Sequence, residues 1–276
     1  MKFTSARRIP TRTTNKESGM ILWFSGTGNT RFLAEYIADA TGDEAKSIND
    51  ILKHGRKCEF ESDKPYVIAA PIYAWRYPAI VEKFLRKAYF GGNRRIYFLA
   101  TMGSQTGNAD RILKKLSAAI DMDYMGFCGV PMPNNYVPMK MQPQNEAEDI
   151  IREALPLMKE LAEKIRSGRN IDKFDRTPAA LLMSGAVNKA FARFAGGSRD
   201  FTVNDCCISC GDCADFCPSS NIIIVEGKPV FREKCLSCFG CINRCPVSAI
   251  VLKNGKDAME RYVSPLYSDW KKKGLI

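Results

Sequence analysis

Histidine is nearly absent from the chain, and long apolar runs are missing. The single histidine among 276 residues is His54. This argues against zinc sites built from cysteine and histidine, and against catalysis by a histidine acid or base. No stretch approaches the roughly 20 consecutive apolar residues of a membrane-spanning helix. Residues 1–19 also lack the apolar centre of a secretory signal. We therefore expect a soluble, cytoplasmic chain without a membrane span, in which residues 1–19 form a disordered extension before Met20.

Cysteine, in contrast, is abundant and concentrated. Nine of the eleven cysteines lie between Cys206 and Cys245. Without a signal peptide, this clustering indicates metal ligation in a reducing compartment instead of disulfides. Two runs, 207–218 and 235–246, share the spacing C-x2-C-x2-C-x3-C-P. Each cysteine of the second run follows its counterpart by 28 residues, so the sequence contains one ligand-bearing unit twice.

This repeat predicts two [4Fe–4S] clusters. In such runs three closely spaced cysteines wrap one face of a cubane, and the fourth ligates the other cluster. Small residues such as Gly211 and Gly240 let backbone N–H groups approach the sulfurs. Zinc, the alternative, uses two CxxC pairs or mixtures of cysteine and histidine, which eight regularly repeated cysteines do not match. The predicted ligand sets are Cys207, Cys210, Cys213 and Cys245 for one cluster, and Cys235, Cys238, Cys241 and Cys217 for the other.

The cysteine repeat resembles the two-cluster ferredoxins of bacteria over about 50 residues. Between its two runs, the apolar segments 221–225 and 229–231 flank a short Glu-Gly-Lys turn, which predicts a β-hairpin. We expect a small α+β ferredoxin domain over residues 200–252, with this hairpin as an apolar lid over the clusters. Cys206 has no counterpart in the repeat, so we expect that it is not a ligand.

The N-terminal part opens with a strand, a loop of small residues and a helix. The apolar segment 20–24 leads into Ser-Gly-Thr-Gly-Asn-Thr, and a helix over 31–40 follows. Such a loop presents backbone N–H groups and a helix N-terminus to an anion. A dinucleotide fingerprint would need glycine at Arg31, and the GxxxxGK[ST] pattern is absent from the sequence. The loop resembles the phosphate-binding loop of flavodoxins, which implies that FMN contacts Ser25, Gly26, Thr27, Gly28, Asn29 and Thr30.

Further strands and helices alternate along the N-terminal part. This alternation predicts an α/β fold, a doubly wound, flavodoxin-like parallel sheet of five strands. In the strand order 2-1-3-4-5, FMN lies where the first and third strands diverge, and the loops that leave those strands are 25–30 and 71–78. The predicted strands are 66–70, 95–100 and 123–130, and the predicted helices are 79–88, 109–120 and 147–167.

Two more loops are candidates for contact with the flavin ring. In the loop after strand 66–70, Tyr73 and Trp75 each either stack on the isoalloxazine or pack in the core. The exit loop of strand 95–100 resembles the flavin-lining segment of flavodoxins, although it lacks the aromatic residue usual there. Segment 133–136 is either a further flavin neighbour or an ordinary turn. The predicted contacts in the first two loops are Pro71, Ile72, Tyr73, Ala74, Trp75, Thr101, Met102 and Gly103.

The order of the parts carries a resemblance of its own. The chain begins with an FMN-binding domain over 20–168, followed by a helical connection over 169–199 that contains a helix at 179–194. The ferredoxin domain comes next, and a tail over 253–276 ends the sequence. This order resembles the flavodoxin–ferredoxin fusion proteins of anaerobic bacteria and archaea, from Met20 to about residue 252. The resemblance implies an electron-transfer protein that passes electrons between FMN, two [4Fe–4S] clusters and external redox partners.

Two other functions stay open at this point. An FMN-dependent reductase of a quinone or another small acceptor would need an open pocket over the flavin and a proton donor, which the sequence does not single out. A cluster-bearing regulator that binds nucleic acid is the other, but the net charge of +11 is dispersed without a strongly basic block. That charge favours docking on acidic redox partners. We therefore expect an electron carrier more than an enzyme with its own substrate.

Overall fold

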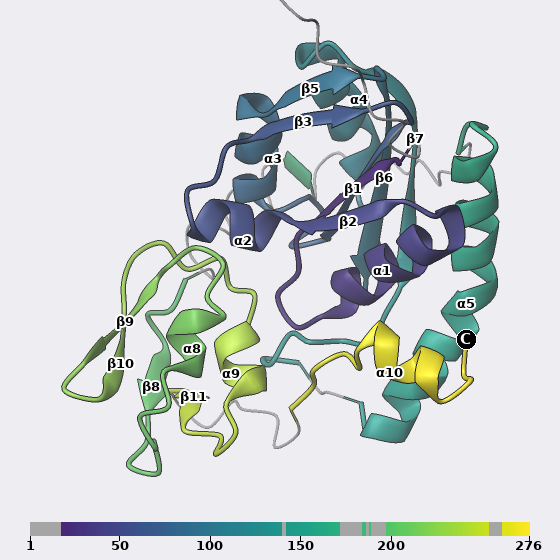
Figure 1. The fold of residues 1–276 in the computed structure, drawn as a ribbon. Helices are drawn as coiled ribbons and strands as arrows, with labels where there is room; N and C mark the ends of the chain where they lie inside the picture. The colour runs from purple at the N-terminus through teal and green to yellow at the C-terminus, as the bar shows by residue number, and fades with distance from the viewer. Residues whose placement is uncertain (1–17, 140–141, 172–183, 186–187, 189–196, 254–260) are drawn as a thin grey trace, which may run out of the picture.

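The structure is a computed structural model that describes residues 18–139, 142–171, 184–185, 188, 197–253 and 261–276 (Figure 1). Nearly all of the predicted extension 1–19 and most of the predicted helix 179–194 lie outside these residues. Within the described part of the chain, no helix is both long and apolar enough to cross a membrane. The described residues form an N-terminal α/β domain, a small cysteine-rich module and a C-terminal segment.

The N-terminal domain is built on a five-stranded parallel sheet in the order β2-β1-β4-β6-β7. Counted along the chain, this is the predicted order 2-1-3-4-5, which the structure confirms. Every residue of β4 is buried, as expected of a central parallel strand that is covered on both faces. The strands are β1 (Met20–Trp23), β2 (Glu44–Ser47), β4 (Tyr66–Pro71), β6 (Arg95–Met102) and β7 (Asp123–Pro131).

Helices cover both faces of this sheet (Figure 1). One apolar cluster lies under α1 and α5, and a second lies under α2, α3 and α4. Because β-strand side chains alternate between faces, Ile21 joins the first cluster and Leu22 the second. The helices are α1 (Asn29–Thr41), α2 (Ile48–Lys53), α3 (Ala79–Lys87), α4 (Ala109–Ala119) and α5 (Gln144–Arg166).

A second, two-stranded parallel sheet was not predicted. It pairs β3 (Glu59–Ser62) with β5 (Tyr89–Gly92) beside the main sheet. Both strands are four residues long and contain glutamate or glycine, residue types that are depleted in strands. The edge strand β2 carries a similarly weak signal, since its sequence is Glu-Ala-Lys-Ser. These strands are fixed by neighbours that lie far away in the sequence.

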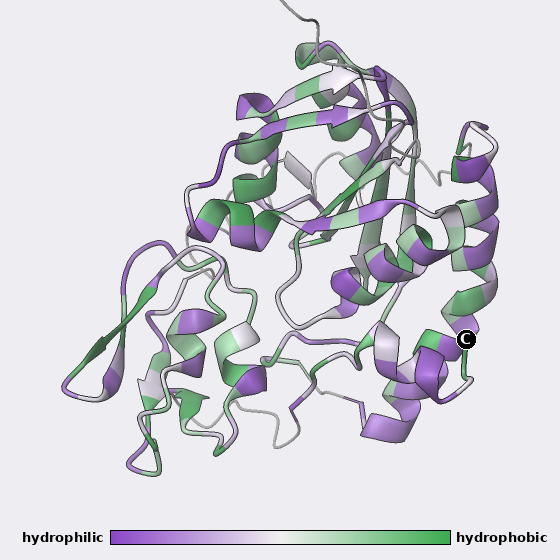
Figure 2. Ribbon diagram, viewed as in Figure 1, coloured by the Kyte–Doolittle hydropathy of each residue, from purple (hydrophilic) through white to green (hydrophobic). Residues whose placement is uncertain are grey.

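The cysteine-rich module consists of two antiparallel strand pairs and two short helices. The predicted hairpin is confirmed as β9 (Ile222–Val225) and β10 (Lys228–Phe231), joined by Glu226 and Gly227. Figure 2 shows the apolar character of this hairpin, which extends from the module. The other pair is β8 (Phe201–Val203) with β11 (Ile250–Leu252), and the helices are α8 (Asp212–Asp215) and α9 (Gly240–Arg244).

The C-terminal segment returns to the N-terminal domain. Its helix α10 (Tyr267–Lys272) lies against α1. Trp270 is buried and meets the ring of Phe32 edge to face, with 5.4 Å between the ring centroids. Such aromatic pairs stabilise a contact beyond their buried area by about 0.5–1.5 kcal/mol. The segment is therefore held against the first turn of α1, close to the loop that precedes this helix.

Candidate redox centre

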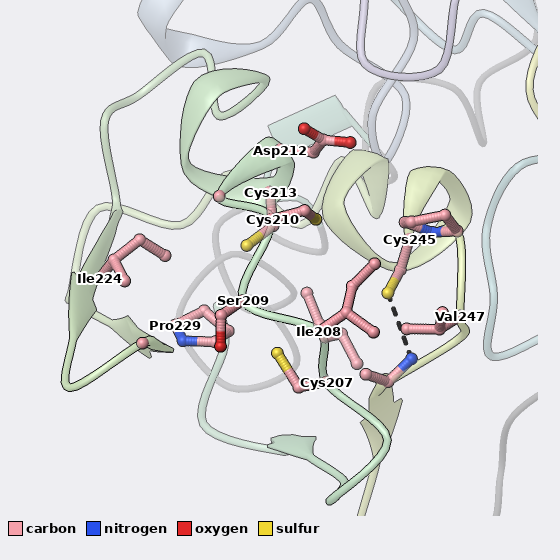
Figure 3. Close-up of a pocket in the computed structure, with 15 residues that line it drawn as sticks. Cys207, Ile208, Ser209, Cys210, Asp212, Cys213, Ile224, Pro229, Cys245 and Val247 are labelled. Carbon is pink, nitrogen blue, oxygen red and sulfur yellow. Dashed lines mark hydrogen bonds between the residues drawn. The ribbon is translucent and has the colours of Figure 1, made fainter.

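One set of four predicted ligands surrounds a single cavity in the outer part of the module. Cys207, Cys210, Cys213 and Cys245 all line it, and Figure 3 shows their side chains around the same space. The backbone N–H of Ala249 donates a hydrogen bond to the sulfur of Cys245 at 3.2 Å (Figure 3). Hydrogen bonds of this kind adjust the reduction potential of a cluster. The fourth cysteine of the second run thus stands with the first three of the first run.

The complementary set surrounds a second cavity nearer the N-terminal domain. Cys217, Cys235, Cys238 and Cys241 line it. Backbone N–H groups again donate to sulfur. That of Asn221 donates to Cys217 at 3.2 Å, and that of Ser237 donates to Cys235 at 3.4 Å. The structure therefore brings together both predicted crossed sets, four cysteines at each cavity.

The four cysteines at each cavity fit a [4Fe–4S] cubane better than a single metal ion. Among the described residues, no three His, Cys, Asp or Glu side chains converge closely enough to hold a single metal ion. A [4Fe–4S] cluster takes four thiolates at separate corners, which matches cysteines spread around a cavity. Burial raises the pKa of the Cys238 thiol to about 12 and that of Cys213 to about 11. Loading these sites therefore requires iron to displace protons from the thiols.

A third cavity, of about 380 Å³, lies at the carboxyl ends of the central strands. Its size falls within the range of cofactor sites. Every predicted flavin contact in the two later loops lines it, and so does segment 133–136. Of the predicted phosphate loop, only Asn29 reaches the cavity wall. Ser104, Gln105 and Met139 also line it, and the cysteine-rich module contributes Leu236, Ser237 and Phe239. The three contacts from the module could not be predicted from the sequence, because they depend on how the module docks.

The predicted phosphate loop is a tightly bonded turn. The backbone N–H of Gly28 donates to the hydroxyl of Ser25 at 3.0 Å, and Gly28 has a φ of 111° that favours glycine. The hydroxyls of Thr30 and Thr101 lie 2.7 Å apart, which joins the loop to the end of β6. Four of its side chains are buried: Ser25, Thr27, Asn29 and Thr30.

A buried polar network ties this loop to the rest of the chain. Tyr262 donates its hydroxyl hydrogen to Asn29 at 2.7 Å, and its backbone N–H donates to Asn243 at 2.9 Å. Asn243 donates to the carbonyl of Asn135 at 3.1 Å, and Asn135 donates to Thr27 at 2.7 Å. We call Asn135, Asn243 and Tyr262 the clasp. Asn243 lies on α9 between two cluster-site cysteines, so the clasp connects the cluster module to the predicted phosphate loop.

Comparison with known proteins identifies both halves of the chain. The family model described as a flavodoxin domain matches residues 20–130, and the model described as a 4Fe-4S dicluster domain matches residues 200–246. The chain is a fusion of a flavodoxin domain and a 4Fe–4S domain. A flavodoxin domain implies FMN, and a dicluster domain implies iron–sulfur clusters, which together indicate electron transfer. No curated protein matches the sequence.

Solved structures resemble part of the fusion protein. A flavodoxin from Megasphaera elsdenii is 18% identical, with 54% of this chain and 98% of that chain covered and a TM-score of 0.34. A flavodoxin from the domain Archaea is 16% identical, with 54% and 99% covered and a TM-score of 0.34. An NADH:FMN oxidoreductase is 17% identical, with 58% and 92% covered and a TM-score of 0.36.

The loop after β4 holds an unusual backbone in the fusion protein. Ala74 and Trp75 have φ values of 46° and 66°, which non-glycine residues adopt at an energetic cost. Asn188 donates to the carbonyl of Ala74 at 2.6 Å, and Ser184 donates to that of Trp75 at 3.0 Å. These bonds hold the strained turn, and both Tyr73 and Trp75 line the 380 Å³ cavity. Which of them stacks on a flavin stays a prediction.

Proposed function

We propose that this chain passes electrons between one FMN and two [4Fe–4S] clusters, and between these centres and external redox proteins. The main support for the proposal is that a single loop bears two cluster-site cysteines and also lines the FMN cavity. Leu236 and Ser237 stand between Cys235 and Cys238, and all four belong to that loop. No acid or base is required in such a protein, because its task is to hold redox groups close together.

The two cluster sites have different roles in this proposal. The cavity of Cys235, Cys238, Cys241 and Cys217 belongs to the flavin-side cluster. The cavity of Cys207, Cys210, Cys213 and Cys245 belongs to the outer cluster, since none of its lining residues also lines the FMN cavity. Exposed apolar residues, Ile208 and Ile224, line the outer cavity. The outer cluster is therefore the exchange point for partner proteins.

The chain's own residues serve the electron path by excluding water and fixing positions. When bound, each cluster exchanges one electron, whereas a flavin accepts one or two, so the pair gathers or divides single electrons. Phe239 is buried against Phe201 and Tyr136, with ring centroids 5.7 and 5.1 Å away. The apolar packing around the flavin-side cluster keeps solvent out, which is one of the factors that set its potential.

A reductase of a small acceptor is the second candidate. The wall of the cavity is only partly apolar, since Ser104, Gln105 and Asn134 contribute polar groups and Met139 is exposed at its margin. A quinone that reached a bound flavin through this cavity would meet these polar groups. Steady reduction of a quinone by the reduced protein, after all protein partners are removed, would establish this activity.

Cofactor content tests the proposal. Anaerobic reconstitution should give about eight irons and one FMN per chain. Cys206 is exposed and lines neither cavity, so Cys206→Ser should keep all the iron, whereas Cys207→Ser should lose about four irons. Bound zinc without a charge-transfer band would contradict the cluster assignment, and clusters without flavin uptake would contradict the role of the flavodoxin domain.

A further inference from the structure

The hydroxyl of Tyr73 is buried and has no hydrogen-bond partner. Only one other side-chain atom among the described residues is in this condition, a guanidinium nitrogen of Arg261. Leaving a buried donor unsatisfied costs about 1–3 kcal/mol, so an orphan of this kind in a packed region points to a group that the protein chain itself does not provide. A tyrosine hydroxyl carries its proton at neutral pH, so it is available as a donor.

The side chain of Tyr73 lies between the FMN cavity and the loop of the flavin-side cluster. Tyr73 lines the FMN cavity. Its hydroxyl lies at the flavin-side cluster loop: a Cβ on Gly26 would be 2.8 Å from the hydroxyl oxygen and 3.0 Å from Cβ of Cys238. The ionisable groups that act on the hydroxyl are Cys238 and Cys235. Tyr73 thus extends from the flavin wall to the cysteines of the flavin-side cluster.

Close approach of two loops creates this junction. A Cβ on Gly240 would lie 2.9 Å from the carbonyl oxygen of Gly26. Because both positions are glycine, the predicted phosphate loop and the cluster loop meet backbone to backbone, with the Tyr73 hydroxyl enclosed beside them. A larger residue at Gly26 would take the place of the hydroxyl.

The backbone around Tyr73 is held firmly. Its N–H donates to the carbonyl of Arg76 at 2.9 Å, and the carbonyl of Tyr73 accepts from Arg76 at 3.3 Å. Arg76 in turn forms a forked ion pair with Glu82, with Nε–Oε1 and Nη2–Oε2 distances of 3.2 and 2.8 Å. Two parallel bonds of this type fix geometry as well as adding stability. The backbone that carries the Tyr73 ring is therefore fixed.

We infer that the Tyr73 hydroxyl donates a hydrogen bond to the flavin-side cluster, held by Cys217, Cys235, Cys238 and Cys241. This inference rests on the proposed function. A tyrosine hydroxyl is a donor, and the sulfurs of a bound cluster are acceptors. A donated hydrogen bond stabilises the more negative, reduced cluster and raises its reduction potential. Tyr73 thus contributes directly to the difference in potential between the flavin-side cluster and the flavin.

The test is Tyr73→Phe in the reconstituted full chain, with Tyr136→Phe as the matched control. Tyr136 also lines the FMN cavity, where its ring meets that of Phe239 edge to face at 5.1 Å. A potentiometric titration followed by electron paramagnetic resonance resolves the two clusters. In Tyr73→Phe the flavin-side cluster should titrate at a more negative potential while the outer cluster is unchanged. Iron release to a chelator should also become about tenfold faster, the effect of losing one charge-assisted hydrogen bond.

Three results separate the outcomes. Unchanged potentials and unchanged iron release in Tyr73→Phe, with full iron and FMN content, would overturn the inference and leave the proposed function intact. Equal shifts of both clusters, or the same shift in Tyr136→Phe, would also overturn it, because the effect would then be general. A wild-type protein that takes up fewer than two clusters or no FMN would overturn both the inference and the proposed function.

Discussion

Cys217→Ser should abolish rapid electron exchange between FMN and the clusters, whereas Cys245→Ser should leave that exchange in place. The two cysteines are equivalent in the 28-residue repeat, yet each lines the cavity of the opposite run. Loss of Cys217 therefore removes the cluster whose loop lines the FMN cavity, and loss of Cys245 removes the outer cluster. Each variant should retain about half of the iron. Anaerobic stopped-flow absorbance, with flavin and cluster signals separated, measures the exchange.

Each variant is the control for the other. Both remove one thiolate from the same type of proline-flanked turn, so a general loss of stability would affect them alike. Exchange that survives in Cys217→Ser and vanishes in Cys245→Ser would reverse the assignment of flavin-side and outer clusters. In Cys245→Ser, electrons from an external protein donor should reach the flavin more slowly, because the exchange point is lost.

Tyr262→Phe should release FMN about tenfold faster than the wild-type protein, which corresponds to the loss of one buried hydrogen bond. Its hydroxyl bonds to Asn29 of the predicted phosphate loop, and both residues are buried. The phenylalanine ring keeps the packing against Ala147, so the change is confined to the hydroxyl. The rise of free-flavin fluorescence after dilution measures the release rate.

Tyr267→Phe is the matched control for the clasp. It removes another hydroxyl of the same segment, one that donates to the exposed carboxylate of Asp39 at 2.7 Å and does not touch the loop. Its FMN release should equal that of the wild-type protein. Equal release from Tyr262→Phe and the wild type would show that the clasp does not contribute to flavin retention.

Most of the sheet could be predicted from the sequence because its central strands are buried on both faces. The segments at β1, β4 and β6 are mainly apolar, whereas β7 at the other edge has a weaker pattern. The structure places the ends of all four strands within two residues of the prediction. The edge strand β2 and the β3–β5 pair could not be predicted, since short polar strands are defined by their partners. Loop 71–78 was placed correctly by topology, but its positive φ angles were not foreseen.

The cluster sites followed from spacing alone, whereas the contacts between the halves did not. Eight cysteines in a repeat specify two crossed sets, and the cavities match those sets. The local sequence around Tyr262 and Asn243 does not predict their contacts with other segments. Tyr262 lies in a tail without a motif, and Asn243 lies between two predicted ligand cysteines. Their roles arise when segments more than 100 residues from the phosphate loop fold against it. The same holds for Tyr73, whose ring was predicted and whose hydroxyl contact was not.

The most direct test of the central claim is the rate of electron redistribution within one molecule. The reconstituted protein is reduced by a single electron in a rapid anaerobic pulse, and the cluster and flavin absorbances are followed at several protein concentrations. Transfer within the chain predicts one rate constant that is independent of protein concentration. A rate that rises in proportion to concentration, or cluster reduction that never reaches the flavin, would contradict the account.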